Sequence, residues 1–69
     1  MIGTFTNSSV QMAIIGRLRR GPHTLESLSA LLDIDLPLIR YAVNGLEAVG
    51  RVRRKGVLVE LIALGRSAA

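Results

Sequence analysis

The sequence predicts a mainly α-helical domain that ends in a small β-hairpin, an α+β fold of three helices and two or three strands. Three stretches between residues 8 and 48 space their apolar residues three or four positions apart, which is helical periodicity. From residue 52 the period changes to two, and a glycine interrupts the run, as in a hairpin. The chain has 69 residues, and 49% of them are hydrophobic. We therefore expect one domain over residues 8–64, with an arm at 1–7 and a tail at 65–69.

The first predicted helix covers residues 8–20. Its apolar positions share one face: Val10, Ile14 and Leu18. Ser8 or Ser9 is expected to cap its start, because a serine hydroxyl accepts a hydrogen bond from a free amide of the first turn. Gly16 lies inside this helix, where glycine costs about 1 kcal/mol relative to alanine, and it suggests a close packing contact.

The second and third predicted helices cover residues 24–32 and 36–48, with Thr24 as the cap of the second. They are joined by a very short turn, in which Asp33 is expected to adopt a left-handed conformation and Asp35 to cap the third helix. The inward face of the third helix is predicted to consist of Ile39, Val43 and Leu46. Its outward face is predicted to carry Leu36, Pro37, Arg40, Tyr41, Asn44 and Glu47.

The C-terminal hairpin begins at residue 52 and is strongly basic. Val52 is expected to point inward and Arg53 outward, with the turn at residues 54–56. The returning strand is predicted to place Val57, Val59 and Leu61 along one face. The tip would then present three successive cations: Arg53, Arg54 and Lys55.

The charge balance indicates an anionic partner. The chain carries nine Lys and Arg residues against five Asp and Glu residues, a net charge of +4, and eight of the nine cations are arginine. Arginine makes forked contacts with phosphate and carboxylate groups. Because there is no cysteine, disulfides and thiolate metal sites are excluded. No apolar run approaches the roughly 18 residues of a membrane span, and no signal-peptide pattern is present, so we expect a cytoplasmic protein without membrane contact.

Catalytic motifs are absent from the sequence. His23 is the single histidine and has no cysteine or pair of acids beside it for a relay, so a structural role is expected. Asp33 and Asp35 are explained as turn and cap residues, and the glycines are too scattered for a phosphate-binding loop. We expect no enzyme activity, no cofactor, no metal and no small-molecule ligand.

The stretch RLRRGPHTLESLSALLDIDLPLIRYAVNGLEAVGRVRR resembles the winged helix-turn-helix domain of small bacterial and phage transcriptional regulators. The matching features are GPHTLESL at the second helix, LIRYAVNGLEAVGRV as the recognition helix and entry to the wing, and the basic turn. The resemblance covers residues 10–64. It implies that bases are read from the recognition helix and that the wing contacts the DNA backbone or minor groove. The implied DNA-binding residues are Leu36, Pro37, Arg40, Tyr41, Asn44, Arg53, Arg54 and Lys55.

Individual roles within this set stay open. Arg40 is interpreted as a forked contact to guanine or as a solvated helix residue, and Asn44 as a contact to adenine or phosphate or as ordinary surface. Tyr41 is expected to contact phosphate or to pack against the wing. Arg19 and Arg20 are explained equally well by phosphate contact and by helix-end electrostatics.

The sequence therefore predicts a sequence-specific double-stranded DNA-binding protein that regulates transcription, as a repressor or activator, by occupying its operator. One domain of this size covers a half-site, so a homodimer or cooperative neighbours are expected. Candidate contact surfaces between copies are Leu31, Leu58, Ile62 and the apolar start MIGTF. The alternative is a winged-helix module for protein–protein contact, an adaptor or inhibitor, and a third hypothesis is binding of double-stranded RNA or non-specific binding of nucleic acid.

Overall fold

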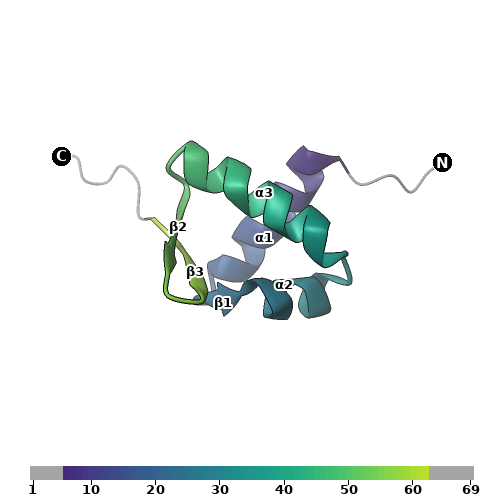
Figure 1. Ribbon diagram of the computed structural model, residues 1–69, viewed down its shortest axis with the longest axis horizontal. Helices are drawn as coiled ribbons and strands as arrows, with labels where there is room; N and C mark the ends of the chain where they lie inside the picture. The colour runs from purple at the N-terminus through teal and green to yellow at the C-terminus, as the bar shows by residue number, and fades with distance from the viewer. Residues whose placement is uncertain (1–5, 63–69) are drawn as a thin grey trace.

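Three helices packed against one antiparallel sheet make up the described part of the protein (Figure 1). The structure is a computed structural model that describes residues 6–62. The elements are α1 (Asn7–Leu18), β1 (His23–Thr24), α2 (Leu25–Leu32), α3 (Leu36–Ala48), β2 (Val52–Lys55) and β3 (Leu58–Leu61). The sheet has three strands in the order β1-β3-β2. The predicted α+β class is confirmed, and of the two or three strands expected the described residues form three, one of which precedes α2.

The start of α1 differs from the prediction. Its cap is Thr6, whose Oγ1 accepts a hydrogen bond from the backbone N–H of Ser9 at 3.0 Å, so neither Ser8 nor Ser9 is the cap. The helix begins earlier because the amide of Val10 already bonds to the carbonyl of Thr6 at 3.1 Å. Apolar spacing indicates which face of a helix is buried, but three neighbouring hydroxyl residues are equivalent caps until the backbone path is known. Residues 1–5 of the predicted arm and residues 63–69 lie outside the described residues.

The turn between α2 and α3 follows the prediction in its backbone. Thr24 caps α2 through a 3.0 Å bond from Ser27 N–H to its Oγ1, and Asp33 adopts the left-handed conformation with φ 57° and ψ 46°. Asp35 occupies the predicted N-cap position of α3, but its carboxylate makes no cap hydrogen bond, so the side-chain part of that prediction is wrong. A cap accepts from the second or third helical amide, and Pro37 at the second position has no N–H to give.

Ser29 fastens this turn to α2. Its Oγ donates a 2.6 Å hydrogen bond to the carbonyl of Ile34, and the amide of Ile34 bonds back to the carbonyl of Ser29 at 3.2 Å. The side chain of Ile34 is buried in the core. Because both polar groups of Ile34 are satisfied by one residue, the path of the chain from α2 into α3 is held at a defined angle.

The hairpin turn is displaced from its predicted position. Lys55 pairs with Leu58 across the ladder, so the turn consists of Gly56 and Val57. Gly56 has φ +65°, the conformation that a two-residue loop of type II′ needs at its first position. Val57 is consequently 79% exposed and does not belong to the inward face as predicted, whereas Val59 is buried.

The short strand β1 was not predicted from the sequence. It pairs with β3 through His23↔Val59 and Thr24↔Leu58 and closes the sheet on the side opposite β2. A two-residue strand carries too little alternation to be recognised by pattern. Its partner strand β3 is therefore hydrogen-bonded on both sides, which holds the hairpin against the helices.

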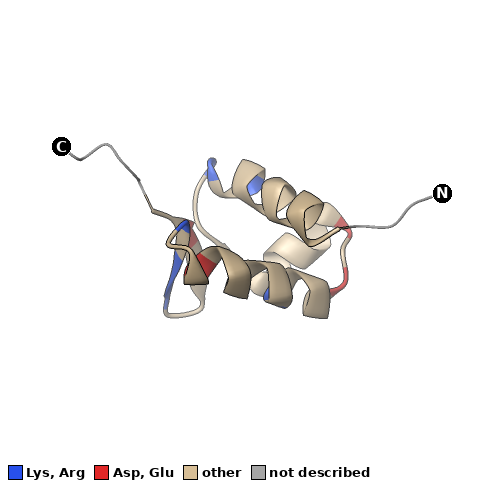
Figure 2. Ribbon diagram, turned by 90° about the horizontal axis from the view of Figure 1, so that it is seen from above, with Lys and Arg blue, Asp and Glu red and all other residues tan. Residues whose placement is uncertain are grey.

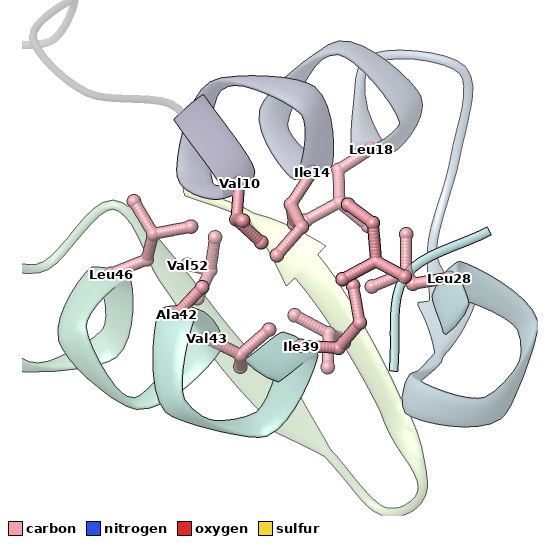
Figure 3. Packing of buried hydrophobic residues seen from close by; sticks show 11 residues of the cluster. Val10, Ile14, Leu18, Leu28, Ile39, Ala42, Val43, Leu46 and Val52 are labelled. Carbon is pink, nitrogen blue, oxygen red and sulfur yellow. The ribbon is translucent and has the colours of Figure 1, made fainter. Parts of the chain in front are cut away.

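The core is wholly aliphatic and draws on every helix and on both long strands (Figure 3). The predicted inward face of α3 is confirmed, with Ala42 added to it. Among the described residues no polar or charged side chain is buried. The buried residues are Val10, Ile14, Leu18, Leu28, Ile34, Ile39, Ala42, Val43, Leu46, Val52 and Val59.

Replacement of Gly16 by alanine is expected to stabilise the protein. The predicted packing contact at Gly16 is wrong, because within the described residues nothing lies within 4 Å of the position of an added Cβ. Gly16→Ala should raise the free energy of unfolding by about 0.5–1 kcal/mol, since glycine loses more backbone freedom in a helix. Thermal denaturation measures this. In Gly45→Ala the new Cβ would lie 2.7 Å from Gln11 Nε2, so a smaller gain is expected there. A lower melting temperature for Gly16→Ala would contradict the prediction.

Removal of the Ser29 hydroxyl is expected to loosen the α2–α3 turn. Ser29→Ala leaves the carbonyl of Ile34 without its side-chain donor, and the free energy of unfolding should fall by about 1 kcal/mol. Urea denaturation measures this change, and the dependence of the free energy of unfolding on urea concentration should stay the same. Ser8→Ala is a suitable control, because Ser8 is exposed and its hydroxyl makes no hydrogen bond within residues 6–62, whereas the Ser9 hydroxyl contacts Thr6 Oγ1 at 2.9 Å.

Candidate nucleic-acid interface

The outer face of α3 is polar and fully accessible. Helical periodicity turns Arg40, Tyr41 and Asn44 away from the side that packs into the core, and all three are exposed, Tyr41 to 67%. Arg40 makes no ion pair within the described residues. Arg40 and Tyr41 are therefore free to contact a ligand that lies along the helix, whereas Asn44 already accepts a hydrogen bond from Arg54.

The residues in the first turn of α3 differ from the prediction in their exposure to solvent. Pro37 is exposed, but Leu36 is half-buried and does not belong fully to the outward face. Leu38, which was not among the candidate residues, is 44% exposed instead. The reason is geometric: at 100° per residue Leu36 lies between the outer face and the buried side that contains Ile39.

The three candidate cations of the hairpin lie in a strand rather than at its tip. Arg53, Arg54 and Lys55 all belong to β2, because the turn begins at Gly56. Alternation along the strand sends Arg53 to the opposite side of the hairpin from Arg54. They therefore do not form one cluster, and the predicted tip of three successive cations is corrected to two faces of a basic strand.

Arg54 connects the hairpin to α3. Its Nη2 donates a 2.5 Å hydrogen bond to Oδ1 of Asn44, and its Nε lies 3.3 Å from Oε1 of Glu47. Asn44 and Glu47 lie one turn apart near the end of α3, so one guanidinium spans both. The predicted base-reading residue Asn44 and the predicted backbone-contacting residue Arg54 are thus in direct contact. Asn44 retains its amide N–H groups as donors, while its oxygen is occupied.

Arg53 is paired within the hairpin. Its Nε lies 2.5 Å from Oε2 of Glu60, the residue directly opposite it on β3. Lys55 is exposed and has no ion pair among the described residues. Sequence reasoning missed Glu47 and Glu60 as partners of the arginines. The strand register could have identified Glu60, but Glu47 required knowledge of how α3 and β2 pack.

Most basic residues lie at one end of the molecule, together with Glu47 and Glu60, and the opposite end is acidic (Figure 2). Basic residues lie on the hairpin and around the end of α1, whereas the turn between α2 and α3 at the other end is acidic, with Asp33 and Asp35. Arg19 and Arg20 are both exposed and follow directly after α1. An extended anion is therefore attracted to the hairpin end and repelled from the α2–α3 turn.

Other kinds of site find little support in the described residues. Over residues 6–62 no group of three or more His, Asp or Glu side chains could hold a metal ion. His23 lies in β1 with its Nδ1 3.4 Å from the hydroxyl of Ser27, and both residues are half-buried. No helix in this part of the chain has the length and hydrophobicity to cross a membrane.

No family model, curated protein or solved structure matches this chain. The candidate interface is consequently defined by its own geometry and charge: the outer face of α3, the basic strand β2, and the Arg54 bridge between them.

Removal of the Arg54 bridge is expected to loosen the hairpin without unfolding the protein. Arg54→Met keeps the aliphatic stem and loses both polar contacts, and the free energy of unfolding should fall by no more than about 1 kcal/mol because the pair is partly exposed to solvent. Relative to the parent protein, the rate of amide hydrogen exchange should increase more in β2 than in α1. Arg53→Met, which loses a bond inside the hairpin, is the matched control. Equal exchange in all three proteins would contradict a bridging role.

Proposed function

We propose that this protein binds double-stranded DNA sequence-specifically and is a small transcriptional regulator of the winged helix-turn-helix class that acts by occupying its operator. In this proposal α2 and α3 are the helix-turn-helix, α3 is the recognition helix, and the β2–β3 hairpin is the wing. A single exposed helix fits the major groove of B-DNA, which is about 12 Å wide. The observation that carries the proposal is the Arg54 bridge, which holds a basic hairpin beside the polar outer face of α3.

In this proposal the exposed residues of α3 make different contacts with bases and phosphates. Arg40 is unpaired among the described residues and is the candidate for a forked contact with guanine. A forked contact with adenine needs both the oxygen and the nitrogen of an amide, and the Asn44 oxygen already accepts from Arg54 on one of its two lone pairs. Arg54 therefore orients the Asn44 amide, whose N–H groups donate to a base or phosphate acceptor. Pro37 and the partly exposed Leu36 suit contact with thymine methyl groups, and Tyr41 suits a phosphate.

The hairpin supplies sequence-independent contacts to the DNA backbone. Lys55 is free to bind phosphate, whereas Arg53 shares its charge with Glu60. A regulator of this size covers one half-site, so we propose that two copies act together, in the cytoplasm, without cofactor or catalytic activity.

The experiment that tests the function is a selection from random duplex DNA followed by a salt titration against the selected and a scrambled duplex. Three to five phosphate contacts give a log–log salt slope of about −3 to −5. The alternative function, a protein–protein adaptor, is favoured by the exposed Leu31 and Leu38 on either side of the turn between α2 and α3. An adaptor would enrich no DNA sequence and would bind DNA with almost no affinity, which would refute the proposal.

Arg40→Ala is expected to reduce sequence discrimination. Loss of one forked contact should lower the preference for one base pair by about 1–3 kcal/mol and leave the scrambled duplex nearly unaffected. Competition binding against single-base variants of the selected site measures this. Unchanged preference at every position would show that Arg40 does not read a base.

Lys55→Ala and Glu60→Gln are expected to change affinity in opposite directions and to leave sequence preference unchanged. Lys55→Ala removes one phosphate contact, so the salt slope should become shallower by about 1. Glu60→Gln removes the carboxylate that holds Arg53, so every duplex should bind more tightly. Titrations of selected and scrambled duplexes at two salt concentrations provide the readout. A change confined to the selected duplex would place the hairpin against bases instead.

A further inference from the structure

The outer side of α1 carries a hollow of about 350 Å³. It is lined by Met12, Ile15, Gly16, Arg19 and Arg51. Met12 is 71% exposed, and the missing side chain at Gly16 leaves the hollow open. Neither arginine forms an ion pair within the described residues. The lining combines apolar side chains with two arginines, and this combination suits an apolar side chain that is accompanied by a carboxylate. We call this surface the α1 groove.

The α1 groove is separate from the candidate DNA interface. Helical geometry places Met12 and Gly16 on the side of α1 opposite Ile14, which is buried against the rest of the core. The outer face of α3 points away from α1, because its own buried side packs on that helix (Figure 3). A ligand in the α1 groove therefore leaves Arg40 and Asn44 accessible.

The complementary chemistry is present at the other end of the same chain. The turn between α2 and α3 presents two exposed carboxylates, Asp33 and Asp35, and neither is ion-paired among residues 6–62. Leu31 and Leu38 lie beside them in sequence and are 45% and 44% exposed. We call these four residues the acidic turn. Figure 2 shows this turn at the end of the molecule that lies away from the basic hairpin.

We propose that the acidic turn of one copy docks in the α1 groove of a second copy. Leu31 and Leu38 supply the apolar contact, and the two aspartates face Arg19 and Arg51. The favoured occupant is a second copy because the opposite charges at the two ends align copies head to tail. Such a contact joins two different surfaces, so it does not close into a symmetric dimer and continues from copy to copy.

This association is weak and sensitive to salt. The two surfaces are small, and interfaces well below about 1,200 Å² are typical of transient contacts. The four charged residues of the proposed contact are exposed to solvent, and exposed charge pairs set the orientation of encounter more than the affinity. The proposal concerns copies in the absence of nucleic acid and does not depend on DNA binding.

Charge reversal on the two surfaces tests the proposal. Sedimentation equilibrium of the full chain without DNA should show an average mass that rises past the dimer with concentration and falls with added salt. Arg19→Glu/Arg51→Glu and Asp33→Asn/Asp35→Lys should each weaken association by about tenfold or more, because like charges then face each other. Asparagine is chosen at position 33 because it tolerates the left-handed conformation there. An equimolar mixture of the two variants should associate again.

Matched variants separate this contact from general charge and folding effects. Arg20→Glu and Glu26→Lys each reverse one charge of the same sign as in the corresponding test variant, near the end of α1 and at the start of α2, outside both surfaces, and should associate like the parent. Circular dichroism confirms that each variant is folded. A monomeric parent at all concentrations, a mass that stops at the dimer, or a mixture that stays dissociated would each overturn the proposal. Titration of a duplex long enough for one copy tests the proposed function separately.

Discussion

The burial of one side of α3 against α1 and the sheet is the constraint on which the rest of the structure depends. Ile39 and Val43 are wholly removed from solvent, and they meet Ile14 and Val59 in the centre of the core. Because a helix of this length buries one side only, its polar residues are forced to the surface. The burial of Ile34 in the same core draws in the α2–α3 turn and fixes the direction in which α3 is presented.

The hairpin is positioned by polar contacts as well as by the core, and those contacts compete with any anionic ligand. Arg54 bonds to Asn44 and Glu47 on α3, and Arg53 bonds to Glu60. Such partly exposed pairs contribute little to stability but restrict the arginine side chains. Phosphate groups that approach the hairpin must share these guanidinium groups or displace the carboxylates. Arginine suits this arrangement, since its five donors can serve two partners at once.

The two ends of the molecule have opposite chemistry, and this follows from where the caps and the hairpin fall. A helix exit and a helix start occur within three residues of each other: Asp33 adopts the left-handed conformation that aspartate tolerates, and Asp35 places a negative charge at the start of α3, where the helix dipole favours it. The basic residues collect where α1 ends and the hairpin begins. Local requirements of backbone geometry thus produce a directional charge distribution across the whole molecule.

The sequence by itself determined the three helices, their buried faces, the left-handed Asp33 and the exposure of Arg40, Tyr41 and Asn44, because periodicity and capping are local properties of the chain. It did not determine the Thr6 cap, the turn at Gly56 and Val57, or strand β1, which depend on where the backbone runs and pairs. The partners of Arg53 and Arg54 and the α1 groove were decided by tertiary structure alone. These ion pairs and this groove are formed by residues of separate elements. The separation of such residues along the sequence does not predict how close they lie in space.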